Sequence, residues 1–140
     1  MKILFDTNVI LDVLLDRKPF SDDAAFLMSF VEQSEIMGFI CATTVTTIYY
    51  LAAKALGHQA ASRHIRTLLN LFVVAPVNRV VLEGAAASKL KDFEDAVIHA
   101  SAIHAGAEYI VTRNSADFKE SRLPVFSPTD LINNLESLKE

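Results

Sequence analysis

Short apolar runs alternate along the chain with longer segments in which apolar residues recur at helical spacing. Each of the first four short runs stops at a polar residue or a proline, as is typical of strands that are buried on both faces. The predicted strands are residues 2–5, 38–42, 71–75, 109–112 and a shorter fifth at 125–126.

The segments between these strands favour helices, because their apolar residues fall on one side at a spacing of three and four. Helices are expected at residues 9–15, 21–33, 44–56, 58–70, 78–90, 92–105 and 129–138. Ser21 is the expected N-cap of the second helix, since a serine hydroxyl accepts a bond from a first-turn amide. Gly57 is expected to end the third helix as a C-terminal cap.

Strands that alternate with helices predict βαβ crossovers, and therefore an α/β fold with a mainly parallel sheet covered on both faces. No repeat, low-complexity segment or linker interrupts the pattern, so residues 1–140 are expected to form a single domain. Ligands of such sheets bind beyond the carboxyl ends of the strands, which is where functional residues are expected.

Composition narrows the function classes. The chain has 140 residues, of which 51% are hydrophobic and 21% charged, so it can bury a core and is not a disordered segment. A single cysteine, Cys41, excludes a disulfide framework and a multi-thiolate zinc site, and indicates a cytoplasmic protein. The net charge of −4 argues against a broad basic surface for nucleic acid, but not against a nuclease that grips phosphate through metal ions.

No targeting or membrane segment is expected. The apolar run before Asp6 is too short for a signal peptide. Residues 36–53 carry no charge over 18 positions, which leaves open a membrane span or a buried strand followed by a helix. A span normally needs about 20 predominantly apolar residues, and this stretch includes four threonines, so the strand and helix are preferred.

Acidic and amide side chains gather at three places, each just after a predicted strand or at the start of a predicted helix. Asp6 comes directly after the first strand, Asp92 and Asp95 open a helix, and Asn114 and Asp117 follow the fourth strand. Each has an ordinary alternative as a helix cap or a turn former. Taken together they predict a site for a hard cation such as Mg²⁺, which prefers oxygen ligands and can activate a water for phosphoryl displacement.

Three segments resemble the acidic motifs of PIN-domain proteins, and most closely those of VapC-like toxins from toxin–antitoxin pairs. They are FDTN at residues 5–8, DFEDA at 92–96 and VTRN at 111–114 with DF at 117–118. The resemblance covers about residues 2 to 130. It implies a three-layer α/β/α sandwich and a Mg²⁺- or Mn²⁺-dependent endoribonuclease that leaves a 5′-phosphate. It also implies a homodimer, and an antitoxin protein whose C-terminal segment covers the site.

By motif match, the resemblance assigns the principal metal-binding acids to Asp6 and Asp95. Asp92 and Asp117 are supporting acids that bind the metal directly or through water, and Asn114 orients a water or a ligand. Thr7, Thr47 and Arg113 are the expected contacts to the RNA substrate.

Thr47 departs from the family pattern, because it stands where the family usually carries a Glu or Asp. No shift of register replaces that acid, since residues 36–82 contain four Lys or Arg and no Asp or Glu. A hydroxyl cannot neutralise a cation, so one metal ion is expected rather than two. The departure leaves an alternative function: a catalytically weakened PIN-like module that binds protein or RNA without cleaving.

Two further assignments have ordinary alternatives. Arg113 is a candidate phosphate contact or a salt-bridge partner of a nearby acid. Lys54, Arg63 and Arg66 either line an approach for RNA or form a solvated helix face. Surfaces for the dimer or the antitoxin are expected on the apolar side of residues 21–33 and at Tyr49 and Tyr50.

A phosphatase with Asp6 as its nucleophile is disfavoured. The haloacid-dehalogenase-like enzymes that place an Asp after their first strand need a second acid two residues later. Asn8 stands at that position.

Overall fold

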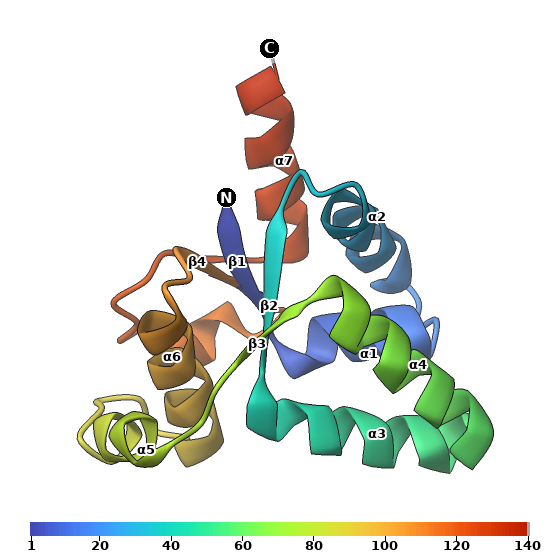
Figure 1. Ribbon diagram of the computed structural model, residues 1–140. Helices are drawn as coiled ribbons and strands as arrows, with labels where there is room; N and C mark the ends of the chain where they lie inside the picture. The colour runs from blue at the N-terminus through green and yellow to red at the C-terminus, as the bar shows by residue number, and fades with distance from the viewer. Residues whose placement is uncertain (140) are drawn as a thin grey trace.

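A five-stranded sheet forms the centre of the computed structural model, which describes residues 1–139 with side chains to residue 137 (Figure 1). Its strands lie in the order β3-β2-β1-β4-β5, and every neighbouring pair is parallel. Their bounds are β1 Lys2–Phe5, β2 Met37–Cys41, β3 Val73–Ala75, β4 Tyr109–Val111 and β5 Val125–Phe126. All five predicted strands are therefore present.

Helices occupy each segment where the apolar pattern predicts one, with ends that differ by a few residues. The largest difference is in α5, which ends at Ala86 rather than at residue 90. A short 3₁₀ turn, η1 Ser115–Phe118, follows β4. The helices are α1 Thr7–Leu14, α2 Ser21–Glu32, α3 Ala42–Leu56, α4 His58–Leu71, α5 Arg79–Ala86, α6 Phe93–Ala105 and α7 Pro128–Lys139.

Two hydrophobic cores separate the sheet from helices on either face. Phe5 of β1 packs in the core formed with α1, α2, α3, α4 and α7, whereas Leu4 packs in the core formed with α5 and α6. Successive side chains of a strand point to opposite faces, so a strand buried on both sides must be apolar throughout. The result is the expected three-layer α/β/α sandwich, visible as helices on both sides of the sheet in Figure 1.

The helix boundaries confirm one predicted cap and correct another. Gly57 ends α3 with a φ of 93°, a left-handed conformation that glycine adopts without strain. Ser21 is not the N-cap of α2. Phe20 holds that position without a side-chain cap, and Ser21 is a buried first residue of the helix.

The uncharged stretch at residues 36–53 divides into β2 and the beginning of α3, as preferred from the sequence. Among the described residues, no helix has the length and apolar character that crossing a bilayer requires.

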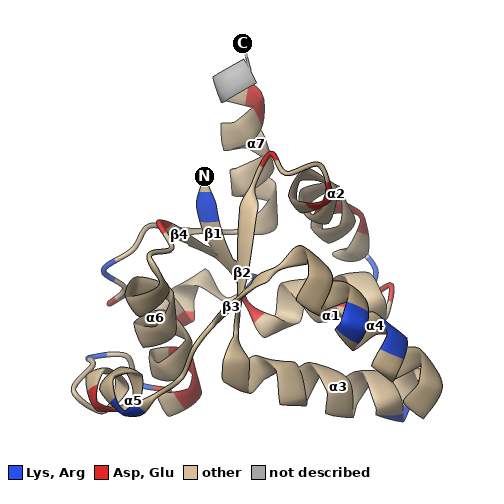
Figure 2. Ribbon diagram, in the orientation of Figure 1, with Lys and Arg blue, Asp and Glu red and all other residues tan. Residues whose placement is uncertain are grey.

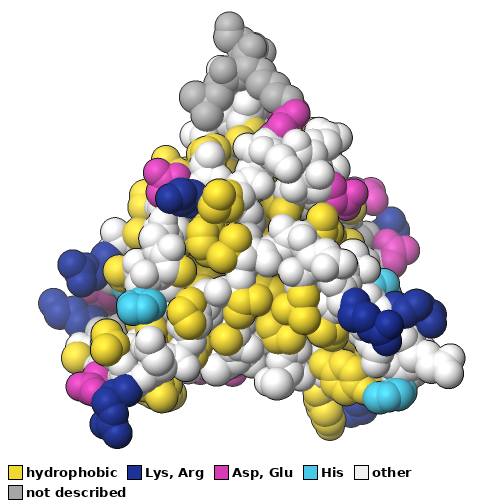
Figure 3. Space-filling model, viewed as in Figure 1, with side chains coloured by type: hydrophobic (Ala, Val, Ile, Leu, Met, Phe, Trp, Pro, Cys, Tyr) yellow, Lys and Arg dark blue, Asp and Glu magenta, His cyan; other side chains and the backbone are white. Residues whose placement is uncertain are grey.

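The edge strand β3 is short and partly exposed. Val73 and Val74 keep 45% and 37% of their surface exposed. Figure 3 shows hydrophobic side chains gathered over the middle of this face, in the region that β2 and β3 occupy in Figure 1. Three residues offer few unpaired backbone groups, which limits pairing with another chain at this edge.

The order of the strands also locates the site. The chain moves from β1 to β2 and β3 on one side of the sheet, and then returns to place β4 and β5 on the other. β1 and β4 are therefore neighbours at the point where the strand order reverses, and the crevice beyond their carboxyl ends is the usual ligand site of such sheets.

Candidate active site

Asp6 lies at the junction of β1 and α1 and is 94% buried, with 6% of its surface exposed. It is the N-cap of α1, since its Oδ1 accepts a hydrogen bond of 2.8 Å from the Thr7 amide. Its Oδ2 accepts a second bond, of 2.7 Å, from the Thr112 hydroxyl. The cap interpretation is therefore correct, and the same bonds fix the carboxylate at the edge of the sheet.

The buried Thr112 hydroxyl ties the loop after β4 to the start of α1. Besides donating to Asp6, its Oγ1 accepts bonds from the Asn114 amide (3.0 Å) and the Asn8 side-chain amide (3.3 Å). Asn8 in turn accepts from the Arg113 amide with its Oδ1 at 3.3 Å. This role of Thr112 was not predicted from the sequence, although a hydroxyl directly after a buried strand was the available signal.

One open pocket of about 350 Å³ brings most of the predicted site residues together. Asp92 caps α6 by accepting a 3.0 Å bond from the Asp95 amide, so both carboxyl groups lie at the start of that helix. Thr47 does not line this pocket. The predicted residues that do are Asp6, Thr7, Asp92, Asp95, Arg113, Asn114 and Asp117.

Negative charge in the pocket is poorly compensated. Burial raises the pKa of Asp95 to about 7, and repulsion from Asp6, Asp92, Asp117 and Glu94 adds to the effect. Burial also raises the pKa of Asp6, against the opposing bonds from Thr112 and Thr7. A pocket in which carboxylates resist ionisation gains free energy by binding a cation.

The donor set fits a hard divalent ion. Its charged oxygens are all carboxylates, the ligands that Mg²⁺ and Mn²⁺ prefer. Among the described residues, no three His, Cys, Asp or Glu side chains form a ready-made cage. Mg²⁺ does not require one, because it is usually held by one or two carboxylates together with waters and substrate phosphate. Asp6 and Asp95 match that pattern.

Two arginines at the pocket share one buried acid. Asp12 in α1 has a side chain that is 1% exposed, and it accepts bonds from Arg17 Nε (2.8 Å) and Arg113 Nε (2.6 Å). Arg113 thus forms the salt bridge that the sequence left open, and it also lines the acidic pocket. The ion pair between Asp12 and Arg17 was not predicted from the sequence. An acid within the apolar residues 9–15 was the signal for a buried ion pair.

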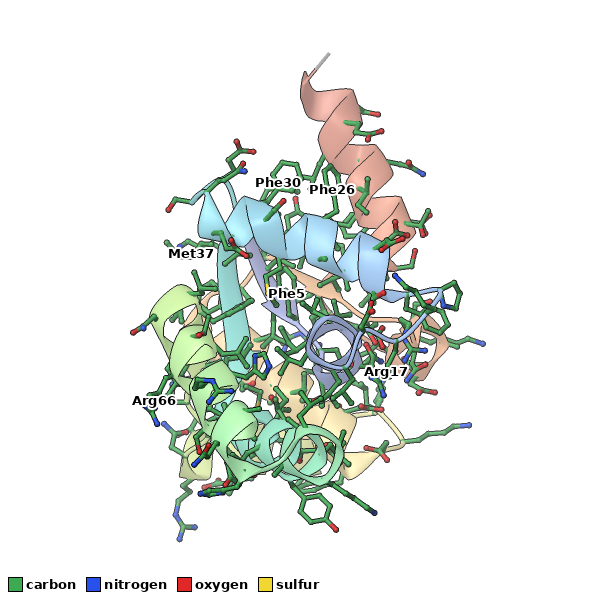
Figure 4. All side chains as sticks on the ribbon, turned by 90° about the vertical axis from the view of Figure 1, so that its right-hand side faces the viewer. Phe5, Arg17, Phe26, Phe30, Met37 and Arg66 are labelled. Carbon is green, nitrogen blue, oxygen red and sulfur yellow. The ribbon has the colours of Figure 1, made fainter. Side chains whose placement is uncertain are left out.

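The basic residues proposed to guide RNA lie elsewhere. Neither Lys54, Arg63 nor Arg66 lines the acidic pocket. Figure 2 marks basic residues along the ribbon of α4, and in Figure 4 Arg66 lies across the molecule from Arg17. On α2, Leu27, Phe30 and Val31 are buried in the core, so most of the apolar side proposed for a partner is already covered.

The PIN-domain family model matches residues 2–116 of the chain. A search of curated protein sequences finds no match to this chain. Among solved structures, the chain is similar to one chain of a toxin–antitoxin complex from Klebsiella pneumoniae, with 27% sequence identity and a TM-score of 0.68. The match covers 90% of this chain and 97% of the Klebsiella chain.

Two more distant structures share the fold. One is VapBC2 from Rickettsia felis bound to a promoter DNA fragment, with 13% identity, a TM-score of 0.69 and coverage of 89% and 97%. The other is VapC20 of Mycobacterium tuberculosis, described as a sarcin–ricin loop cleaving toxin, with 17% identity, a TM-score of 0.63 and coverage of 77% and 86%.

Proposed function

Because this chain belongs to the PIN-domain family, we propose that it is a Mg²⁺- or Mn²⁺-dependent endoribonuclease and the cytoplasmic toxin of a toxin–antitoxin pair. The supporting observation is the acidic pocket at the carboxyl ends of β1 and β4. Four aspartates line it, and the pKa of one of them, Asp95, is raised to about 7. These carboxylates would hold a divalent cation, which would compensate their charge and bind a phosphodiester.

In this proposal the side chains of the pocket divide the work. Asp6 and Asp95 hold the ion, and Asp92 and Asp117 support it directly or through water. Asn114 orients a water at the carboxyl end of β4, while Thr7 and Arg113 contact the substrate. The bound metal would lower the pKa of a water and stabilise the leaving oxygen of the phosphodiester.

Asp6 is well suited to its role because its position does not depend on the metal. The Thr112 hydroxyl and the Thr7 amide hold both of its oxygens, and neither donor carries a charge that would neutralise it. A ligand that is fixed in advance loses little side-chain entropy when the ion binds.

A protein partner is part of the proposal. The similar structures from Klebsiella pneumoniae and Rickettsia felis are a toxin–antitoxin complex and a VapBC complex. We expect an antitoxin to cover the pocket of this chain, and the chain itself to form a homodimer.

The test is metal-dependent cleavage of mixed RNA by the wild type and by Asp6→Asn. Asparagine retains the capping ability of aspartate, so the substitution removes charge and leaves the helix start intact. We expect at least a 100-fold loss of cleavage, since even the outer partners of metal ligands contribute about 10- to 100-fold. Glu136→Gln is the matched control, because Glu136 is an exposed residue of α7. Equal cleavage by Asp6→Asn and the control would refute the assignment.

Thr47 supports one alternative: a PIN-like module that binds RNA or protein without cleaving. The family's acid is missing at this position, and Thr47 does not line the pocket. Calorimetric titration with Mn²⁺ separates the two functions. Heat of binding that disappears in Asp95→Asn supports the nuclease, and no binding at millimolar Mn²⁺ supports the module.

A further inference from the structure

We propose that the acidic pocket continues into a nucleotide subsite, in which Arg17 and Arg113 bind the phosphate next to the scissile bond and Phe20 stacks against the base. This inference rests on the proposed function, because it names how the RNA substrate lies in the same site. It adds Arg17 and Phe20, which both lie in the loop between α1 and α2.

Arg17 and Arg113 are held in place by bonds that leave much of each guanidinium free. Arg113 donates to Asp12 with Nε (2.6 Å) and Nη2 (3.1 Å), and Arg17 donates with Nε to Asp12 (2.8 Å) and with Nη2 to the Asn8 carbonyl (3.2 Å). Each guanidinium has five N–H groups. Two of the five are used, so three on each arginine lack an acceptor among the residues that the structure describes.

The charge of this cluster favours an anion. Two guanidiniums share the single carboxylate of Asp12, so these three side chains together carry a net charge of +1 beside the aspartates of the acidic pocket. The side chains of Arg17 and Arg113 are 38% and 25% exposed, so their free N–H groups reach solvent. Planar guanidiniums with fixed orientation are the preferred protein partners of phosphate.

Phe20 provides the surface for a base. The Arg113 guanidinium lies 3.9 Å from the centre of its ring, and the side chain is still 42% exposed. A second pocket of about 430 Å³ opens here, lined by Phe20 and Arg113 with Pro19, Asp23, Ser127 and Thr129. Because Arg113 lines both pockets, a phosphate on Arg113 leaves its nucleoside next to Phe20.

RNA is the occupant that these groups fit. Proteins recognise single-stranded RNA by stacking unpaired bases on aromatic rings and by binding the backbone with positive charge. A further pocket of about 510 Å³ shares Asp92, Asp95 and Asp117 with the acidic pocket, and Lys89, Lys91, Lys119 and Glu120 also line it. A strand crossing the metal pocket would therefore find basic side chains as well as the carboxylates.

Binding of a fluorescein-labelled single-stranded RNA of mixed sequence tests the subsite. Anisotropy is measured in Mg²⁺ with Asp6→Asn as the background, so that cleavage does not interfere. Adding Phe20→Ala should weaken binding roughly 5- to 150-fold, because stacking contributes about 1–3 kcal/mol per base. Adding Phe20→Tyr should restore it. Phe26→Ala is the matched control, since Phe26 on α2 is 43% exposed but packs against Phe30 and lines neither pocket (Figure 4).

Arg17→Gln provides a second measurement that does not depend on Phe20. Losing one phosphate contact should reduce the slope of log K against log salt by about 0.7 for a single strand. Melting curves of each variant establish that the fold is retained.

The outcomes separate this inference from the nuclease proposal. If RNA binding depends on Phe20 and Arg17 but the wild type shows no metal-dependent cleavage, the subsite is supported and the nuclease is refuted. Active wild type combined with unchanged RNA binding and salt slope in both variants overturns the subsite alone. Equal losses in Phe20→Ala and Phe26→Ala also overturn it, because the effect would then not be specific to this pocket.

Discussion

Two buried aspartates, six residues apart, meet opposite electrostatic surroundings. Asp6 is held by a hydroxyl and an amide, and it forms no salt bridge with the residues that the structure describes. Asp12 accepts bonds from two guanidiniums. A buried carboxylate without a paired cation is costly to ionise, whereas a paired one is not. The contrast supports the proposed role of Asp6 in holding a cation, whereas Asp12 positions the two arginines.

Asp95 predicts a dependence of stability on pH. Its pKa is about 7 in the folded protein, against an ordinary value of 3.8. The folded state therefore holds a proton that the unfolded state releases, and stability falls as the pH rises from about 4 to about 7. Asp95→Asn removes the repelled charge, so we expect a higher melting temperature than wild type at pH 8 in EDTA.

The difference should shrink as the pH is lowered to 5, where Asp95 is protonated in the folded wild type. Thermal melts at both pH values measure it, with Glu136→Gln as the control. A destabilised Asp95→Asn at pH 8 would contradict the electrostatic account of the pocket.

The sequence was most informative where a residue's place relative to a strand determines its role. That Asp6 and Asn114 lie together could be predicted because the carboxyl ends of parallel strands share one side of the sheet, and both line the acidic pocket. The Asp12–Arg113 bridge could not, because it joins residues 101 apart and depends on how α1 lies against the loop after β4. Phe20 was missed for the same reason, since its ring meets Arg113 only in the folded chain.

Among the elements, β2 leaves little room at Gly38 beside Phe72, which follows α4, and Val31 of α2. A Cβ added to Gly38 would lie 2.7 Å from the ring of Phe72 and 3.1 Å from Val31. Gly84 in α5 has room for a side chain, because a Cβ added there would lie 3.8 Å from its nearest neighbour, Ala100. The two glycines therefore have opposite consequences for packing.

We expect Gly38→Ala to destabilise the protein by about 1–3 kcal/mol, the usual cost of overpacking a core. Gly84→Ala should stabilise it by about 0.5–1 kcal/mol, because alanine is the better helix former. Urea denaturation of both variants measures the two effects. A Gly38→Ala protein as stable as Gly84→Ala would mean that the ring of Phe72 moves aside freely.

Elements were predictable because each strand is a nearly unbroken apolar run and each helix has an apolar side. Boundaries were less so, since they depend on caps that form in three dimensions. Asp6 begins α1 at Thr7, two residues before its apolar pattern starts. Asn78 begins α5 by accepting a bond from the Val81 amide, but nothing in the apolar pattern indicated that the helix would stop at Ala86.

At the scale of the whole molecule, charge is segregated. The acids of the pocket lie near the carboxyl ends of β1 and β4. By contrast, the charged residues at 36–82 are all basic and include the arginines of α4 (Figure 2). The net charge of −4 is therefore unevenly distributed, with an acidic pocket in one place and a basic α4 in another.

Metal binding to that pocket should stabilise the entire chain, because only the folded state brings the carboxylates together. At 100 times its dissociation constant, Mn²⁺ would add about 2.7 kcal/mol, which corresponds to roughly 5–10 °C in melting temperature for a domain of this size. EDTA should reverse the shift and Asp95→Asn should reduce it. An identical shift in wild type and Asp95→Asn would place the ion elsewhere.

The hydrogen bond between Asp6 and Thr112 spans 106 positions of the polypeptide. On a translating ribosome, Asp6 emerges early, and the partners that complete its pocket emerge only after β4 has been synthesised. N-terminal segments start to fold during synthesis, but this crevice cannot close until both halves of the sheet are present. A nascent or prematurely terminated chain that lacks β4 therefore lacks the assembled pocket.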